Sequence, residues 1–187
     1  PNILVYSRSI PICEVPRMTY GNKPSDGGNL ILSQEERNSI INKTPDLMPY
    51  IRRYVGSRDF INNDEVRYCL WLRNASPAVY RKNAEVMRRL NAVKELRLKS
   101  SAKPTQALAE KPYLFFSAPQ TESDYLIVPN VSSEKRKYIP IGFMSKDIIA
   151  SNAVQIVPNA TLYHFGVLTS NVHMAWGRIV TGRLKSD

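Results

Sequence analysis

The sequence has 187 residues, 43% of them hydrophobic and 22% charged, and these ordinary globular values exclude an intrinsically disordered chain. Its apolar runs are strand-sized, far short of the roughly 20 residues that a membrane-spanning helix needs, so we expect no membrane partner. Lys and Arg (26) outnumber Asp and Glu (16) and give a formal net charge of +10. This surplus favours a polyanionic partner but does not exclude a basic protein without one.

The length predicts a single domain over 1–187. Because the chain starts at Pro1 without a methionine or a signal-type leader, we expect it to be a piece of a longer protein. We expect three parts: 1–76 with a helical pair and a hairpin, a basic helix over 77–99, and a mainly β part over 100–187 that ends in a helix.

The first part of the chain predicts short elements. A capping box, in which Ser33 caps a helix and Glu36 reaches back to its backbone, begins a helix that runs to about Asn42. A second helix starts at Thr44-Pro45 and stops at Gly56. The other predictions are extended segments over 3–17, a turn-rich loop over 21–29, a strand over 30–32, and a hairpin that joins 60–61 to 66–72.

The helical pattern over 77–99 has one apolar face and one polar face. Val86, Leu90 and Val93 share the apolar face. Arg89 and Arg97 lie on or beside it, so we expect their stems to be buried and their charged heads to reach a partner. The segment 100–105 breaks this helix.

The remaining residues are mostly β-formers. A last helix over 169–181 places Val172, Trp176 and Ile179 on one face, which we expect to point inward. Helices, then strands, then a helix predict an α+β fold with a mixed or antiparallel sheet and flanking helices. The expected strands are 113–116, 125–128, 138–143, 154–157 and 160–164.

Metal binding and catalysis find little support in the sequence. Cys13 and Cys69 have apolar neighbours and predict two buried free thiols in a reducing, cytoplasmic compartment, and no zinc-site spacing exists. The glycines of the loop over 21–29 lack the spacing of a phosphate-binding loop or a cofactor fingerprint. His164, expected in an aromatic strand, favours a structural hydrogen bond, and His173 follows an inward-facing position. A self-contained nucleic-acid-processing enzyme that uses these two histidines remains an alternative.

Basic residues gather in three clusters without a matching acidic block, which favours a surface that follows phosphates, although an acidic protein partner is a further alternative. The first cluster holds Arg81, Lys82, Arg88, Arg89, Lys94, Arg97 and Lys99 and continues to Lys103; the second holds Lys135, Arg136 and Lys137; the third holds Arg178, Arg183 and Lys185.

The second cluster differs from the others because Glu134 stands inside it. A glutamate can accept from the amino group of cytosine, and an arginine can donate to both acceptors of guanine. In an extended segment, Glu134 and Arg136 would face one groove while Lys135 and Lys137 faced away. Simple neutralisation of its basic neighbours explains Glu134 equally well.

Several stretches, taken in order, resemble the MmeI-like (type IIL) single-chain restriction–modification enzymes and their methyltransferase relatives. The resemblance covers nearly the whole chain and lies in the target-recognition domain of that family. The stretches are 21–30 (GNKPSDGGNL), 68–72 (YCLWL), 128–143 (VPNVSSEKRKYIPIGF), 163–176 (YHFGVLTSNVHMAW) and 182–185 (GRLK).

The resemblance implies that this chain recognises a sequence in double-stranded DNA and has no catalytic residue or cofactor of its own. It implies a bacterial parent enzyme, similar to S-adenosylmethionine-dependent adenine methyltransferases, whose catalytic domain lies in the same polypeptide. The family's base contacts imply such roles for Glu134, Arg136, Ala102 and Lys103. The basic residues of the clusters would hold the DNA backbone: Arg81, Lys82, Arg88, Arg89, Lys94, Arg97, Lys99, Lys135, Lys137, Arg183 and Lys185.

Overall fold

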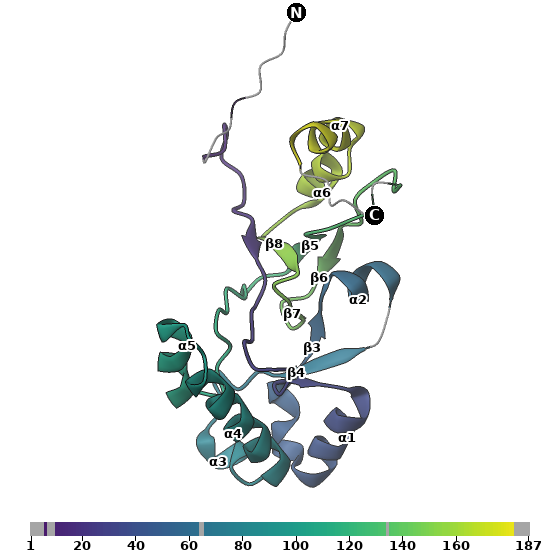
Figure 1. Cartoon of the computed structure of the whole chain (residues 1–187). Helices are drawn as coiled ribbons and strands as arrows, with labels where there is room; N and C mark the ends of the chain where they lie inside the picture. Colours follow the sequence, from purple (N-terminus) through teal and green to yellow (C-terminus); the bar gives the residue numbers. More distant parts are fainter. Residues whose placement is uncertain (1–5, 7–9, 64–65, 134, 182–187) are drawn as a thin grey trace, which may run out of the picture.

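A computed structural model of the chain describes residues 6, 10–63, 66–133 and 135–181. Two four-stranded sheets lie one above the other along the molecule, with helices at both ends (Figure 1). The fold is therefore α+β, as predicted. Within the described residues, no helix is long and apolar enough to cross a membrane.

The first sheet is antiparallel and has the order β1-β8-β5-β6. Its centre is the β5–β8 pair, in which Leu126 lies opposite Val157. The side chains of Tyr125, Ile127 and Ile156 are completely buried in a small core beneath this pair. The strands are β1 (Thr19–Tyr20), β5 (Tyr125–Pro129), β6 (Gly142–Met144) and β8 (Val154–Pro158).

The second sheet is mixed and has the order β2-β4-β3-β7. Strands β2, β4 and β3 are antiparallel, and β3 is parallel to β7, with Tyr54 opposite Ile149. The larger core lies between this sheet and helices α1 and α4 and contains Leu70, Ile40 and Val93. The strands are β2 (Ile31–Leu32), β3 (Ile51–Val55), β4 (Arg67–Leu70) and β7 (Ile149–Ala150).

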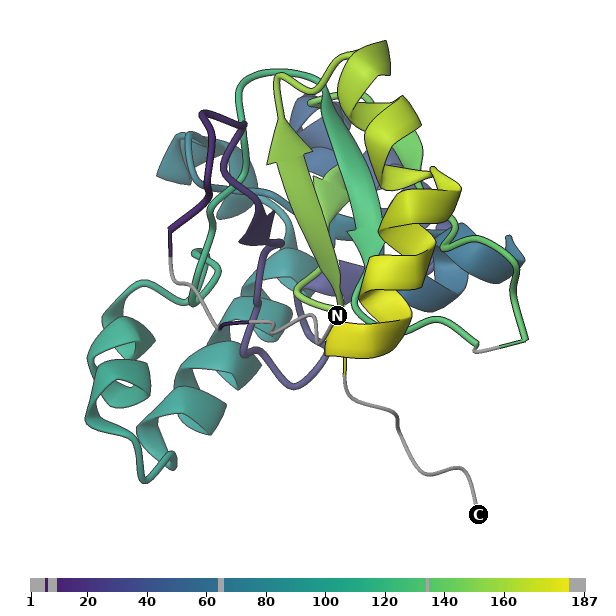
Figure 2. The ribbon, with the colours of Figure 1, turned by 90° about the horizontal axis from the view of Figure 1, so that it is seen from above.

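Helices occupy the two ends of the molecule. The end built on the second sheet carries α1, α3, α4 and α5, and the end built on the first sheet carries α6 and α7 (Figures 1 and 2). The helices are α1 (Gln34–Lys43), α2 (Ser57–Asn62), α3 (Pro77–Tyr80), α4 (Ala84–Leu98), α5 (Lys103–Ala107), α6 (Leu162–Leu168) and α7 (Asn171–Val180), with 3₁₀ turns η1 (Pro45–Tyr50) and η2 (Leu108–Glu110).

Elements with a local capping signal form as predicted. The Ser33 hydroxyl accepts from the Glu36 backbone, and the Glu36 carboxylate accepts from the Ser33 backbone, which confirms the capping box of α1. The helix predicted over 77–99 is instead divided in two. Asn83 divides it, because its side chain caps α4 by accepting from Val86 and donates to the Thr44 hydroxyl.

Two predictions between 44 and 72 are wrong. The second helix ends as a 3₁₀ turn at Tyr50, and the next five residues form β3, the strand at the centre of the second sheet. The expected hairpin does not form, because residues 60–61 belong to α2. Asp59 accepts from the backbone of Gly56 to cap this helix and also pairs with Arg67 at the start of β4.

The C-terminal part also differs from the prediction. Residues 113–116 form no strand, and residues 162–168 form helix α6 instead of a strand. In α7, the predicted inward face points outward: Val172 is 79% exposed and Ile179 is 71% exposed, while Met174 is buried. Cys69 is buried as expected, but Cys13 is exposed.

Candidate nucleic-acid interface

The loop that follows β5 is held firmly at its first residue. The backbone N–H of Asn130 donates to the Ala153 carbonyl at 3.3 Å, and its side-chain amide donates to the Asn152 carbonyl at 3.1 Å. The Gln155 amide on β8 donates to the Asn130 side-chain oxygen at 2.8 Å. All three contacts join the loop to the β7–β8 turn and to β8, so its starting point is fixed by the first sheet.

The other end of this loop is held by α7. The Tyr138 hydroxyl donates to Asn171 Oδ1 at 2.9 Å, and Asn171 is the first residue of α7. Ser170 caps that helix by accepting from the backbone N–H of His173. The loop therefore spans from the sheet to a capped helix. We call residues 130–138 the recognition loop.

Between its two ends the recognition loop turns rather than running straight. The backbone N–H of Arg136 donates to the Ser133 carbonyl at 3.1 Å, and the ammonium of Lys137 lies 5.4 Å from the Tyr138 ring centre. The expected alternation of an extended segment therefore does not hold here, because a turn does not send every second side chain to the same side. Glu134 lies outside the described residues.

A groove of about 910 Å³ opens beside the recognition loop. Its walls are α2, the loop with Pro129 and Ile139 at its ends, and α7. The buried Nε of Arg136 and Oγ of Ser132 face this region with no hydrogen-bond partner among the described residues. Lys135 also lines the groove and is exposed. The groove thus offers hydrogen-bond donors and positive charge to a ligand.

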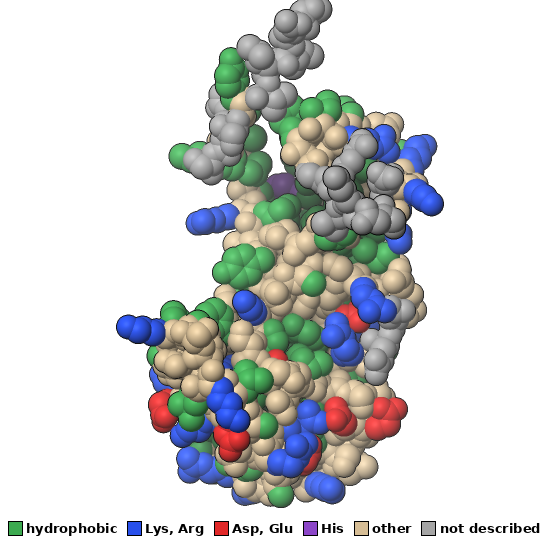
Figure 3. All heavy atoms as spheres, viewed as in Figure 1, with side chains coloured by type: hydrophobic (Ala, Val, Ile, Leu, Met, Phe, Trp, Pro, Cys, Tyr) green, Lys and Arg blue, Asp and Glu red, His purple; other side chains and the backbone are tan. Residues whose placement is uncertain are grey.

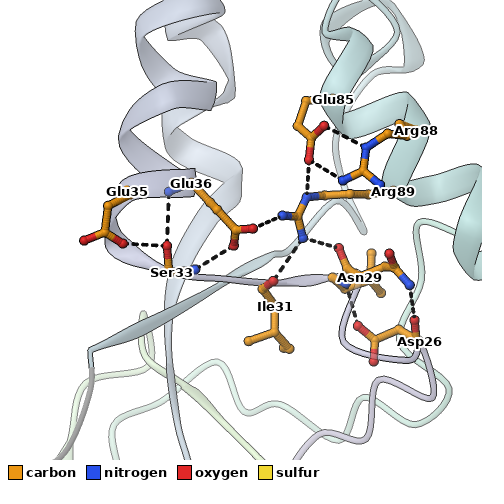
Figure 4. A network of polar contacts seen from close by, with 10 residues as sticks. Asp26, Asn29, Ile31, Ser33, Glu35, Glu36, Glu85, Arg88 and Arg89 are labelled. Carbon is orange, nitrogen blue, oxygen red and sulfur yellow. Dashed lines mark hydrogen bonds and ion pairs between the residues drawn. The ribbon is translucent and has the colours of Figure 1, made fainter.

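The exposed cations of the first cluster lie at the opposite end of the molecule, and two of them are already paired. Both ends of the Glu85 carboxylate accept from Arg88, at 2.7 and 2.8 Å, and the Lys94 ammonium lies 3.5 Å from Glu110 (Figure 4 shows Arg88 and Glu85). Hydrogen bonds from Arg88 and Arg89 lower the pKa of Glu85 to about 2, against a desolvation effect in the other direction. The other exposed members are Arg81, Lys82, Lys99 and Lys103.

Contrary to the prediction, the Arg89 guanidinium does not extend toward a partner molecule, because it donates to acceptors within the chain. It donates to Glu85 at 2.9 Å, pairs with Glu36 on α1, and donates to the Asn29 and Ile31 carbonyls at 3.2 Å (Figure 4). The residue is only 6% exposed. Arg89 therefore joins α4 to α1 and β2, and its assignment as a DNA-backbone contact is wrong.

Arg97 is a second correction, with the same physical reason. It is completely buried, and its five N–H donors reach the backbone carbonyls of five residues. Burial lowers the pKa of its guanidinium below the ordinary arginine value. Arg97 holds together the segments that surround the end of α4 and has no donor left for phosphate. The five acceptors are Pro24, Ser25, Leu108, Lys111 and Leu114.

Polar side chains of the glycine-rich segment over 21–29 form hydrogen bonds within the chain. The Asn22 side chain is buried and donates to Ala150 and Gln120, and the Asp26 carboxylate accepts from the Leu30 backbone. Gly27 and Gly28 adopt positive φ, which glycine tolerates at no steric cost. This segment is therefore a folded turn held by its own hydrogen bonds.

The two histidines lie on the last two helices, α6 and α7. His164 Nδ1 accepts from the Thr161 backbone at 3.0 Å and caps α6, so its expected structural hydrogen bond is confirmed in a helix rather than a strand. His173 lies on α7, and its buried Nδ1 has no hydrogen-bond partner among the described residues. Among the residues that the structure describes, no three His, Cys, Asp or Glu side chains could together hold a metal ion. Burial raises the pKa of the Cys69 thiol and keeps it neutral.

The structure does not bring the two predicted base-contacting segments together. Ala102 and Lys103 are exposed at the start of α5, which lies far from the recognition loop in both views of the ribbon (Figures 1 and 2). Lys135 and Lys137 are exposed on the loop itself. Arg183 and Lys185 lie outside the described residues.

The surface charge differs between the two ends. On the face shown in Figure 3, Lys and Arg side chains at the α1 and α4 end are mixed with Asp and Glu, whereas near α7 none of the described side chains in view beside the cations is acidic. The sequence did not indicate that α2 and α7 would form the walls beside the recognition loop. No local signal could have done so, because Ser57 and Arg178 are far from the loop in sequence and are brought to it only by the fold.

Comparison with known proteins gives three consistent matches. The family model described as "MmeI, target recognition domain" matches residues 1–187. DNA methyltransferase A of Bacillus subtilis (strain 168) is 42% identical over 186 residues, which are 100% of this chain and 21% of that protein. A solved structure of the type IIL restriction–modification enzyme MmeI in complex with DNA is 45% identical, with a TM-score of 0.90, over 98% of this chain and 24% of that one. The chain thus spans about a fifth to a quarter of these relatives.

Proposed function

Because this chain belongs to the family of the MmeI target recognition domain, we propose that it recognises a specific sequence in double-stranded DNA for a larger, S-adenosylmethionine-dependent adenine methyltransferase. The observation that carries the proposal is the recognition loop, which is fixed at Asn130 and Tyr138 and exposes Lys135 and Lys137 between them. A loop held at both ends loses little conformational freedom on binding, which favours accurate contacts with base edges.

The proposed base contacts follow from the chemistry of two side chains. Arg136 can donate to both acceptors on the major-groove edge of guanine, and Glu134 can accept from the amino group of cytosine. A guanine–cytosine pair presents both groups, so one base pair could satisfy both residues. The buried, unpartnered Nε of Arg136 supports this role, because it is a donor without an internal acceptor among the described residues.

Backbone contacts would hold the duplex in register while the loop selects the sequence. We propose Lys135 and Lys137 for phosphates next to the recognised base pair, and Arg81, Lys82, Arg88, Lys94 and Lys99 for more distant ones. Ala102 and Lys103 would be a second place of base contact. Since they lie far from the recognition loop, a duplex that touched both would extend along the molecule.

The chemistry of methyl transfer would belong to the rest of the parent polypeptide. Relatives of this chain are four to five times longer. A methyltransferase that acts on a base must take that base out of the duplex, so a recognition domain must grip the helix while the base is flipped. S-adenosylmethionine would supply the methyl group in that separate domain, and the residues of this chain would bind and orient the DNA.

The test exchanges the two proposed base contacts together in the parent enzyme. Replacing Glu134 by Lys and Arg136 by Asp reverses the donors and acceptors, so the preferred base pair at one position of the methylated site should change. Sequencing of methylated genomic DNA from cells that express each enzyme measures the preference. Each mismatched contact costs about 1–3 kcal/mol, or roughly a tenfold to hundredfold change in selectivity. An unchanged methylated sequence would disprove the assignment.

A further inference from the structure

The charged residues that the structure describes in the walls of the groove are all cationic. Arg58 on α2, Lys135 on the loop and Arg178 on α7 all line it. The side chains between them include the hydroxyls of Ser132 and Thr181, and none of the described lining residues is acidic. Cations and hydroxyls without carboxylates are the set that binds phosphate oxygens. The composition of the groove therefore favours a phosphodiester chain over a neutral or basic partner.

Gly177 forms part of the α7 wall and leaves the helix backbone open to the groove. A Cβ atom placed on this residue would have no other heavy atom within 4 Å, so no packing contact requires a glycine here. A glycine in the interior of a helix lowers stability relative to alanine by roughly 0.5–1 kcal/mol. Gly177 differs from Gly166, the other open glycine of the C-terminal helices, because it lines the groove, where the missing side chain would let another molecule approach the helix backbone closely.

Two polar atoms at this site have no hydrogen-bond partner within the part of the chain that the structure describes. Arg136 Nε and Ser132 Oγ are buried, line the groove and have no hydrogen-bond partner among the described residues. Buried polar atoms of native proteins are normally paired, and an unpaired one indicates a missing ligand or water. Because both atoms belong to the recognition loop, a ligand in the groove would lie directly beside the base that the loop contacts.

We propose that this groove binds the sugar–phosphate backbone of the DNA strand next to the recognised base pair, with Arg178 and Lys135 as phosphate contacts on opposite sides and Gly177 as the point of close approach. The inference rests on the proposed function and adds α7 and α2 to the interface. It assigns Arg178 and Gly177, on α7, a role in affinity. Sequence choice stays with the recognition loop.

The experiment measures binding of a short, fluorescently labelled DNA duplex of mixed sequence to the 187-residue chain by anisotropy, across a series of salt concentrations. Gly177→Glu places a carboxylate in the groove and should weaken binding by at least about tenfold through repulsion of phosphate. Gly166→Glu is the matched control, because Gly166 is also an exposed helical glycine with nothing within 4 Å of a Cβ, but it does not line the groove. It should change affinity by less than about twofold.

Two smaller substitutions, to alanine, control for the possibility that a glutamate variant misfolds. Gly177→Ala and Gly166→Ala should both unfold at equal or slightly higher temperature than the wild type, because each gains helix propensity. Only the first should weaken DNA binding. Arg178→Gln should lower the slope of log Kd against log salt by about one unit, as expected for one lost phosphate contact.

The outcomes separate this inference from the proposed function. Equal affinities for the Gly177 and Gly166 variants would overturn the groove as a DNA site, even if the exchange of Glu134 and Arg136 still changes the preferred base pair. A wild-type chain that binds no duplex at any salt concentration overturns both. Loss of affinity at Gly177 with an unchanged base preference in the parent enzyme supports the division of roles between groove and loop.

Discussion

Two basic regions of this molecule, α4 and the recognition loop, use arginine in different ways. On α4, Arg89 and Arg97 are buried and donate to carboxylates and backbone carbonyls, so their charge joins segments of the chain. In the recognition loop, Arg136 retains a buried Nε with no partner among the described residues. The difference teaches that net charge alone does not locate an interface, because a guanidinium saturated by internal acceptors offers nothing to a ligand.

The comparison extends to the exposed cations of each region. Arg88 donates to Glu85 from Nε and Nη2, and Lys94 lies near Glu110, so part of the positive field on α4 is cancelled by nearby carboxylates. The described lining of the groove contains no carboxylate. The α4 end therefore uses part of its charge in internal ion pairs, whereas under the proposed function Lys135 and Arg178 at the groove would offer their charge to DNA.

The largest expected effect comes from replacing Arg97, because its guanidinium is the most completely paired one within the described part of the chain. Arg97→Met keeps much of the volume but leaves five backbone carbonyls without their donors, so we expect a loss of about 3–5 kcal/mol of unfolding free energy. Urea denaturation followed by circular dichroism measures it. Arg97→Lys retains the charge but supplies only three donors, so it should also destabilise the protein. Arg81→Met is the exposed control and should change stability by less than about 0.5 kcal/mol.

The next largest effect is expected at Gly21, which contacts the segment that contains β7 and β8. Gly21 donates its backbone N–H to Val154 on β8, and an added Cβ would lie 2.2 Å from the Ser151 carbonyl oxygen. Because that neighbour is backbone beside β7 and cannot swing away, Gly21→Ala should destabilise the fold by about 2–3 kcal/mol. The open Gly166→Ala is the control. Equal melting temperatures for these two variants would show that this contact tolerates displacement.

The sequence predicted those parts of the fold that depend on local signals. The Ser33 and Glu36 side chains carry the complete capping box of α1, so that helix start was predictable. Strand β3 was not predictable, because Ile51 and Tyr54 form a strand only through their pairing with β4 and β7, which are distant in sequence. The outward face of α7 was missed for a similar reason, since helical periodicity shows which residues share a face but not where that face points.

The candidate site was predictable in part. Family resemblance, together with a glutamate inside a basic run, indicated the segment around Arg136. The burial of the Arg89 stem was foreseen from its place beside an apolar face, but the internal acceptors of its charged head were not, because Glu36 lies on another helix. The α7 wall of the groove was not foreseen either, since Gly177 looks like any other helix glycine until the fold places it opposite the loop.

A smaller effect tests the ion pairs at the α4 end through their pH dependence. The folded-state pKa of Glu85, about 2, lies below the ordinary unfolded value of about 4.3, so its pairing stabilises the fold above that value. This contribution should be lost as the pH falls from about 5 toward 2. Wild type should therefore exceed Glu85→Gln in stability at neutral pH, and the difference should shrink over that range. A difference that stays constant with pH would contradict the assigned pairing.

The smallest expected effect compares one cation from each region in DNA binding. Lys135→Gln should lower the slope of log Kd against log salt by about one unit, because a lysine that lines the groove would contact a phosphate directly. Arg88→Gln should lower it by less, about half a unit, because Glu85 already holds the Arg88 donors and is released to repel DNA when they are removed. Glu85→Gln should in turn strengthen binding slightly by freeing Arg88. The salt series used for the groove variants measures all three. Equal slopes for the Lys135 and Arg88 variants would mean that internal pairing does not decide which cations DNA can use.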